Sequence, residues 1–102
     1  MRRIIWAPAA QADFRQAMMY LNDRDPAGAR LVSERIGAAV ELLARRPIGR
    51  PTKMSGVFVK LIARTSYALT YSTSASELMV LRLIHQRRRN APGGLPEEDE
   101  GP

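Results

Sequence analysis

The chain of 102 residues contains no cysteine. Without thiols it can form neither a disulfide framework nor a thiolate metal site, and such a composition is typical of proteins in the reducing cytosol. The chain also lacks any apolar run approaching the roughly 20 residues that a membrane-spanning helix needs, and its first segment, "MRRIIWAPAAQADF", contains no signal-peptide core. We therefore expect a cytoplasmic protein with no membrane segment.

Groups that commonly carry catalysis are scarce. His85 is the only histidine, and no histidine–carboxylate spacing typical of a metal site surrounds it. No glycine-rich phosphate-binding loop occurs, because the "PGG" at 92–94 opens no helix. The sequence places no pair of carboxylates in one cleft. It therefore indicates no metal site and no cofactor, and the residue types alone identify no catalytic set.

Lysine is scarce as well, because 14 of the 16 basic residues are arginine, in a chain of net charge +6. Four of the ten acidic residues form the run "EEDE" at 97–100, so residues 1–96 carry 16 basic and 6 acidic side chains, a net charge of +10. Arginine offers a planar fork of donors that suits phosphates and carboxylates, which favours a polyanionic partner. Solubility and a GC-rich genome would produce the same bias, so composition alone leaves both explanations open.

Apolar periodicity predicts one folded unit of helices and strands. Steps of three and four residues predict two helices, over 9–22 and 26–45. Alternating or β-branched runs predict four strands, over 2–7, 57–64, 66–73 and 77–84. The order β-α-α-β-β-β predicts an α+β fold, with a helical hairpin packed on one face of a small twisted antiparallel sheet.

The domain is expected to cover residues 1–92. The stretch 46–56 contains two prolines and two glycines, so we expect a loop there. Residues 93–102 contain glycine, proline and acids with almost nothing to bury, so we expect an acidic, disordered tail.

One face of the predicted sheet is left free by the helices. Side chains alternate along a strand, and Arg82 is expected to mark the free face, because burying an unpaired arginine is very costly. Lys60 and Arg64 indicate the same face in the strand at 57–64. These cations would form a basic surface suited to phosphates or to an acidic, amphipathic peptide. The candidate binding residues are Lys60, Arg64, Arg82, His85, Arg87, Arg88 and Arg89.

Each candidate also has a purely structural interpretation. Arg82 could pair with Glu77 or lie along an edge of the sheet. A single histidine is more often structural or solvent-facing than catalytic. Tyr67 and Tyr71, two residues apart, fit strand packing better than a platform for stacking bases.

Four segments in order carry a resemblance to a known family. They are "IIWAPAAQADFRQAMMYL", "DPAGARLVSERIGAAVELLARRPIGRP", "TSYALTYS" and "ELMVLRLIHQRRRNAP". The Pro-Ile-Gly-Arg-Pro ending of the second segment is the most specific piece. The last segment stands in the place of the family's hydrophobic-Leu-Arg-hydrophobic-hydrophobic-His-x-x-Arg ending. Over about residues 4–92 the chain resembles the RelE/ParE superfamily of bacterial type II toxins, especially its ParE-like branch.

This resemblance implies the element order given above and a toxin of a plasmid stabilisation-like toxin–antitoxin system. Such a toxin is held inactive in a hetero-oligomer by a cognate antitoxin, whose tail is often acidic or amphipathic. ParE-like members inhibit DNA gyrase and need no catalytic set, and this is the function we expect. RelE-like members are endoribonucleases that cut messenger RNA on the ribosome. A decayed member that only binds its antitoxin is a third possibility.

In the ribonuclease alternative the resemblance assigns roles to three residues. Arg64 and Arg82 would neutralise the phosphate, and His85 would act as acid or base. The chain departs from the RNA-cutting members at Gln86, where some of them carry an aromatic residue, and in having only Lys53 and Lys60 before the central strands. It departs from ParE-like members at 90, where an asparagine replaces an aromatic residue.

Overall fold

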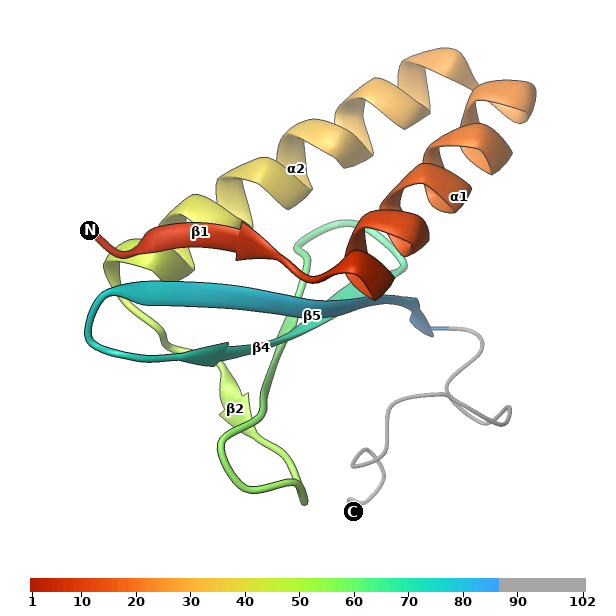
Figure 1. Cartoon of the computed structure of the whole chain (residues 1–102). Coiled ribbons are helices and arrows are strands. Elements are labelled where there is room, and N and C mark those ends of the chain that lie inside the picture. The colour runs from red at the N-terminus through yellow and green to blue at the C-terminus, as the bar shows by residue number, and fades with distance from the viewer. Residues whose placement is uncertain (87–102) are drawn as a thin grey trace.

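The structure is a computed structural model that describes residues 1–86 (Figure 1). Its elements, in chain order, are β1 (Arg3–Trp6), α1 (Pro8–Arg24), α2 (Pro26–Arg45), β2 (Arg50–Pro51), β3 (Phe58–Leu61), β4 (Tyr67–Thr73) and β5 (Glu77–His85). The strands form one five-stranded sheet in the order β1-β5-β4-β3-β2. Both helices lie on the same side of this sheet, so the domain has two layers (Figure 1).

The predicted α+β class and the order of its elements are confirmed. The two predicted helices agree with α1 and α2 to within two residues at each end. The expected loop at 46–56 contains the short strand β2. This strand pairs with β3, and the sequence analysis did not predict it. The expected antiparallel sheet is in fact mixed, because β1 pairs with β5 in parallel.

Some expectations concern residues beyond 86. The tail predicted at 93–102 and the arginines at 87–89 lie outside the described residues. Within residues 1–86, neither helix combines the length and the apolar character that crossing a bilayer requires.

Proline sets the start of both helices. Pro8 and Pro26 lie in the first turn, where a missing N–H removes no helical hydrogen bond. Asp25 is the one residue between the helices, and its Oδ1 accepts a hydrogen bond of 3.0 Å from the Gly28 N–H. The chain therefore reverses direction at a capped helix start, and α1 and α2 form a hairpin (Figure 1).

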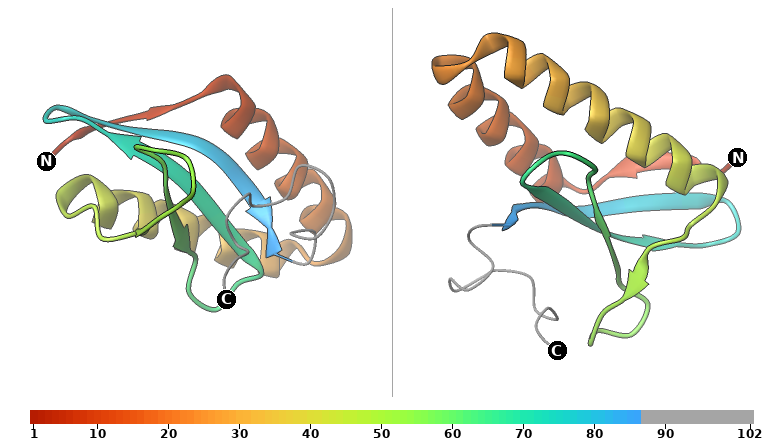
Figure 2. Two further views of the ribbon diagram at one scale, coloured as in Figure 1. Left: turned by 90° about the horizontal axis from the view of Figure 1, so that it is seen from below. Right: turned by 180° about the vertical axis from the view of Figure 1, so that it is seen from behind.

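The core lies between the hairpin and the sheet. Its largest fully buried side chains are Tyr71, Ile36, Leu43, Leu69, Leu78 and Val80. Burying each such side chain contributes about 1.5–3 kcal/mol. The far end of the hairpin extends past the strands (Figure 2). Met19 of α1 and Leu31 of α2 remain exposed.

A β-bulge in the β4–β5 pair changes which side chains of β5 face the helices. Tyr71 pairs with Val80 and Thr70 pairs with Arg82, so Leu81 is an extra residue in β5. Strict alternation would place Arg82 on the same side as Val80, but Arg82 lies on the helix-free face, as expected. The bulge lets Val80 face the core while Arg82 lies on the opposite face with Thr70.

Gly49 gives a physical reason for the Pro-Ile-Gly-Arg-Pro motif. Its N–H donates a 2.6 Å hydrogen bond to the hydroxyl oxygen of Tyr71. A Cβ at this position would lie 2.7 Å from Cε1 of Tyr71 and 2.8 Å from the carbonyl oxygen of Val59, closer than real Cβ atoms approach. Burial raises the pKa of Tyr71, against the opposing effect of the Gly49 hydrogen bond, so the hydroxyl stays neutral. Only glycine allows this close approach.

We predict opposite effects of the same substitution at two glycines. Gly49→Ala should lower the free energy of unfolding by about 1–3 kcal/mol, because the new methyl group overlaps Tyr71 and Val59. Gly37→Ala should raise it by about 0.5–1 kcal/mol, because Gly37 lies within α2 and a Cβ there meets nothing within 4 Å. Urea unfolding of both variants measures the two changes. Equal stability of Gly49→Ala and the parent chain would contradict the close-approach argument.

Candidate functional site

Asp13 of α1 joins the helix to β5 at the candidate residue Arg82. The Arg82 guanidinium donates from Nε to Asp13 Oδ2 at 2.8 Å and from Nη2 to Asp13 Oδ1 at 3.1 Å. The same carboxylate accepts a 2.9 Å hydrogen bond from the backbone N–H of Leu83. Pairing between β1 and β5 ends at Val80, so Asp13 supplies an acceptor where β1 no longer covers the edge of β5.

The Arg82 cation therefore already has a partner within the chain. Its hydrogen bond to the Asp13 carboxylate raises the pKa of Arg82, and partial desolvation opposes this rise. The Asp13 side chain is only 15% exposed, whereas that of Arg82 is 50% exposed. Two of the five N–H donors of the guanidinium are used by Asp13. Arg82 is thus a positioning residue between α1 and β5, with part of its surface in solvent.

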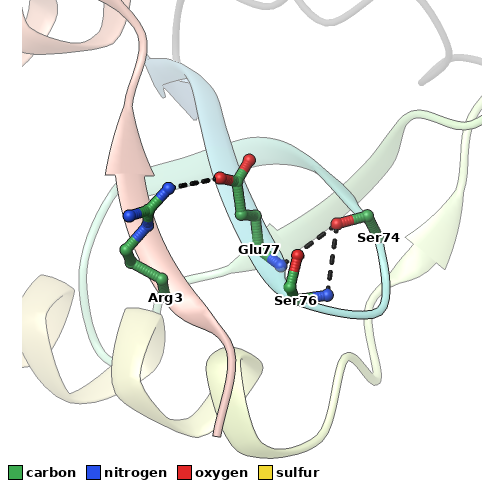
Figure 3. A network of polar contacts seen from close by, with 4 residues as sticks. All are labelled: Arg3, Ser74, Ser76 and Glu77. Carbon is green, nitrogen blue, oxygen red and sulfur yellow. Dashed lines mark hydrogen bonds and ion pairs between the residues drawn. The ribbon is translucent and has the colours of Figure 1, made fainter.

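The alternative pairing of Arg82 with Glu77 is wrong. Glu77 instead accepts a 2.6 Å hydrogen bond from Nη2 of Arg3, which joins β1 to β5 (Figure 3). At the turn before β5, Oγ of Ser74 accepts hydrogen bonds from the backbone N–H groups of Ser76 at 3.3 Å and Glu77 at 3.1 Å. These contacts fix the start of β5, at the opposite end from Arg82.

Lys60 was expected on the helix-free face, and this expectation is wrong. Lys60 pairs directly with Leu69, which is fully buried in the core beneath the helices. Directly opposed residues of an antiparallel pair share a face, so Lys60 lies on the helical side of the sheet. There it lines a hollow together with Arg35 and Ala38 of α2. Its position near the edge lets the long side chain carry its charge outward from the core side.

Arg64 and His85 lie where β3, β4 and β5 approach the same end of the sheet. Arg64 is exposed in the turn between β3 and β4, with a positive φ of 60°. His85 ends β5 opposite Tyr67, and the two rings meet edge-on with centroids 5.0 Å apart. Tyr67 is buried, so its predicted packing role is confirmed. Within residues 1–86 no three histidine, aspartate or glutamate side chains gather closely enough to hold a metal ion.

The predicted basic residues do not gather on one face of the sheet. Lys60 lies on the helical side, Arg82 lies on the other side at the opposite flank of β4, and Arg64 lies in a turn. The predicted convergence is therefore wrong for these three. Their roles in binding, and that of His85, stay predictions, and Arg87, Arg88 and Arg89 lie outside the described residues.

Sequence reasoning missed a groove along the outer edge of β3, which we call the edge groove. Two adjoining hollows of about 240 and 320 Å³ share Lys60 and Leu61. Together they are lined by Arg35, Ala38, Ala39, Leu42, Ile48, Gly49, Arg50, Val59, Lys60, Leu61 and Ala63. A signal existed in the sequence, because Ala38 and Leu42 are apolar positions of α2 outside its buried stripe. Asp13 was missed too, although it belongs to the segment "IIWAPAAQADFRQAMMYL" that carries the family resemblance.

Comparison with known families identifies the family of this chain. Residues 4–90 match the family model described as the ParE toxin of the type II toxin–antitoxin system parDE. The chain belongs to the ParE toxin family. Membership confirms the resemblance to the RelE/ParE superfamily and implies an antitoxin partner. No curated protein sequence gives a match.

Solved structures share the fold of this ParE-family chain. A structure of the chromosomal ParDE toxin–antitoxin system from P. aeruginosa aligns with a TM-score of 0.72 at 22% identity, covering 81% of this chain and 94% of that one. The YoeB dimer from Staphylococcus aureus aligns with a TM-score of 0.57 at 13% identity, covering 79% and 92%. The YoeB/ParE toxin from Agrobacterium tumefaciens gives 0.55 at 17%, covering 79% and 94%. At these identities the likeness establishes the fold.

We predict that Asp13 contributes far more to the stability of this ParE-family chain than its charge alone would. Asp13→Ala should lower the free energy of unfolding by about 1–3 kcal/mol, because it removes two bonds to Arg82 and leaves the Leu83 N–H without its acceptor. Glu77→Ala is the matched control, because it breaks an exposed ion pair with Arg3 worth about 0.2–1 kcal/mol. Urea unfolding measures both changes, and equal losses would contradict the proposed joining role of Asp13.

Proposed function

We propose that this ParE-family toxin inhibits DNA gyrase by binding to it, performs no chemistry of its own, and is neutralised in a hetero-oligomer with its antitoxin. The observation that carries this proposal is the engagement of Arg82. Its guanidinium holds the Asp13 carboxylate through two hydrogen bonds. The proposed target requires the toxin to act in the cytoplasm.

RNA cleavage would require several groups around one phosphate. The phosphate must be neutralised, the 2′-hydroxyl activated and the leaving oxygen protonated. Arg82 presents its guanidinium to Asp13, and the sheet separates it from Lys60. His85 meets the Tyr67 ring edge-on. Among the described residues this arrangement favours a binding protein over a ribonuclease.

A toxin that acts by binding requires an exposed surface with apolar and charged groups rather than a reactive centre. The helical hairpin exposes Met19 and Leu31, and the edge groove exposes Leu42 and Leu61. Exposed apolar side chains that gather in this way are typical of protein-binding surfaces. The match to the ParE toxin family supports gyrase as the bound protein, because gyrase is the target expected of ParE-like members.

We predict that His85→Gln separates the two activities. Expression of the parent toxin without its antitoxin should cause filamentation with DNA damage, and purified toxin should inhibit gyrase supercoiling. His85→Gln should retain this inhibition to within a few fold, because binding needs no proton transfer. A ribonuclease should lose activity by at least about 100-fold on losing its acid or base.

The control is the unfolding temperature of His85→Gln, since the ring packs against Tyr67. Rapid loss of translation with cut messenger RNA, abolished by His85→Gln, would replace the proposal by the ribonuclease alternative. Unchanged growth on expression of the parent toxin would contradict both toxic activities and leave an antitoxin-binding module.

A further inference from the structure

We propose that the hairpin formed by β2 and β3 binds the phosphate backbone of the duplex DNA on which gyrase acts. We call residues 50–59 the β2–β3 arm. This inference deepens the proposed function and rests on it, because a toxin bound to gyrase would lie beside the DNA of that enzyme. Three features of the arm support the inference: its charge, its projecting shape and its fixed tip.

Positive charge is concentrated outside the helical hairpin. Residues 8–45 contain five arginines and five acidic residues, so α1 and α2 together carry no net charge. The following segment, 46–76, contains five cations and no acidic residue. A DNA duplex is a dense double row of negative charge, and acidic side chains facing it would be repelled. The acid-free segment that contains the arm therefore suits this polyanion.

The arm presents two cations of this segment to solvent. Arg50 lies in β2 and Lys53 lies in the turn that follows, and both residues are exposed. Within residues 1–86 neither of them forms an ion pair, whereas Arg82 is engaged by Asp13. No carboxylate of the described chain competes with a phosphate for Arg50 and Lys53, so both can make charge-assisted hydrogen bonds to it.

The arm projects from the body of the protein. It extends away from the helices, past β4 and β5 (Figure 1, Figure 2). Its base is a two-stranded ribbon, in which Arg50 pairs with Val59 and Pro51 pairs with Phe58. A two-stranded β-ribbon is narrow enough to enter the major groove of B-DNA. Cations on such a ribbon reach the phosphates beside the groove and fix the position of the protein on the duplex.

Hydrogen bonds fix the turn at the tip of the arm. Oγ1 of Thr52 donates to the Val57 carbonyl oxygen at 2.9 Å and accepts from the Met54 N–H at 3.1 Å. The Thr52 N–H donates to the Val57 carbonyl oxygen at 3.0 Å. Gly56 has a φ of 80°, which glycine adopts without strain. A turn that is already formed loses little conformational entropy on binding, so the tip is preorganised for a ligand.

Other partners fit the arm less well than duplex DNA. A specific protein interface buries about 800 Å² on each partner, around an apolar centre. Within 50–57 the single large exposed apolar side chain is Met54, which is too little for such a centre. An RNA duplex has a deep and narrow major groove that a ribbon does not enter.

We predict that removing the two arm cations weakens DNA binding by the purified full-length toxin. Fluorescence anisotropy with a labelled DNA duplex of about 20 base pairs measures the affinity at several salt concentrations. The double variant Arg50→Gln/Lys53→Gln should bind at least about tenfold more weakly, and its log–log salt slope should fall by about two, because two phosphate contacts are lost.

The matched control is Arg15→Gln/Arg30→Gln, which removes the same net charge from exposed positions of α1 and α2. It should weaken DNA binding less than about twofold. The exchange Arg50→Lys/Lys53→Arg preserves the charge of the arm and should also stay within about twofold. Circular dichroism and unfolding temperature establish that each variant is folded. Equal weakening by the two glutamine double variants would overturn the proposal, because net charge alone would then explain the binding.

Two further measurements test the nature of the partner. An RNA duplex of the same sequence should bind more weakly than DNA, and tighter binding of RNA would overturn the proposal in favour of an RNA partner. Calorimetry with the purified antitoxin should give affinities within about twofold for the two glutamine double variants. Selective loss of antitoxin binding in the arm variant, with unchanged DNA binding, would overturn the proposal in favour of a protein partner.

The supercoiling assay connects the arm to gyrase. The arm variant should require at least about tenfold more toxin than the control variant for the same inhibition, and equal potency would exclude the DNA of gyrase as the ligand. Parent toxin that binds DNA through the arm but does not inhibit gyrase would contradict the proposed target alone. Inhibition of gyrase by parent toxin, with equal DNA affinities of the two double variants, would contradict the role of the arm alone.

Discussion

One carboxylate joins the two layers of this protein. Asp13 of α1 binds the guanidinium of Arg82 twice and the backbone N–H of Leu83 once, and it is itself only 15% exposed. Apolar packing is non-directional and would allow α1 to slide along the sheet, whereas three hydrogen bonds to one charged group fix the helix in register with β5. The bulge at Leu81 makes this contact possible, because it places Arg82 outside the core row while Val80 and Leu83 remain buried.

The two edge regions of the sheet differ in how far their backbone groups are covered. On one flank β1 covers β5 as far as Val80, and beyond that point Asp13 takes the exposed N–H of Leu83. On the other flank β2 covers β3 only at Phe58 and Val59, and in the described chain no side chain or strand takes over beyond it. Natural sheets commonly protect such edges. The edge of β3 beyond Val59 is therefore less protected than the edge of β5.

The same arrangement bears on how the toxin works. In the described residues Lys60 and Arg82 lie on opposite sides of the sheet, Arg82 is engaged by Asp13, and Arg64 lies exposed in a turn. Their positive charge can still attract acidic protein segments over a distance. Such long-range attraction depends on net charge and does not require the cations to converge on one point. This separation is the basis for our proposal that the toxin acts by binding rather than by bond cleavage.

Local pattern in the sequence determined the elements and the class of the fold. The three- and four-residue spacing of apolar residues, Pro8 and Pro26 at helix starts, and the alternation around Tyr67 and Tyr71 act within a few residues of each other, so a single sequence suffices to read them. The tertiary structure alone decided the rest. One inserted residue, Leu81, placed Arg82 and the buried Val80 on opposite faces. The partner of Arg82 lies 69 residues away, and the pairing of Lys60 with Leu69 placed a cation on the core side. Alternation carries no mark of a bulge, and ion pairs and strand edges form only when distant segments meet.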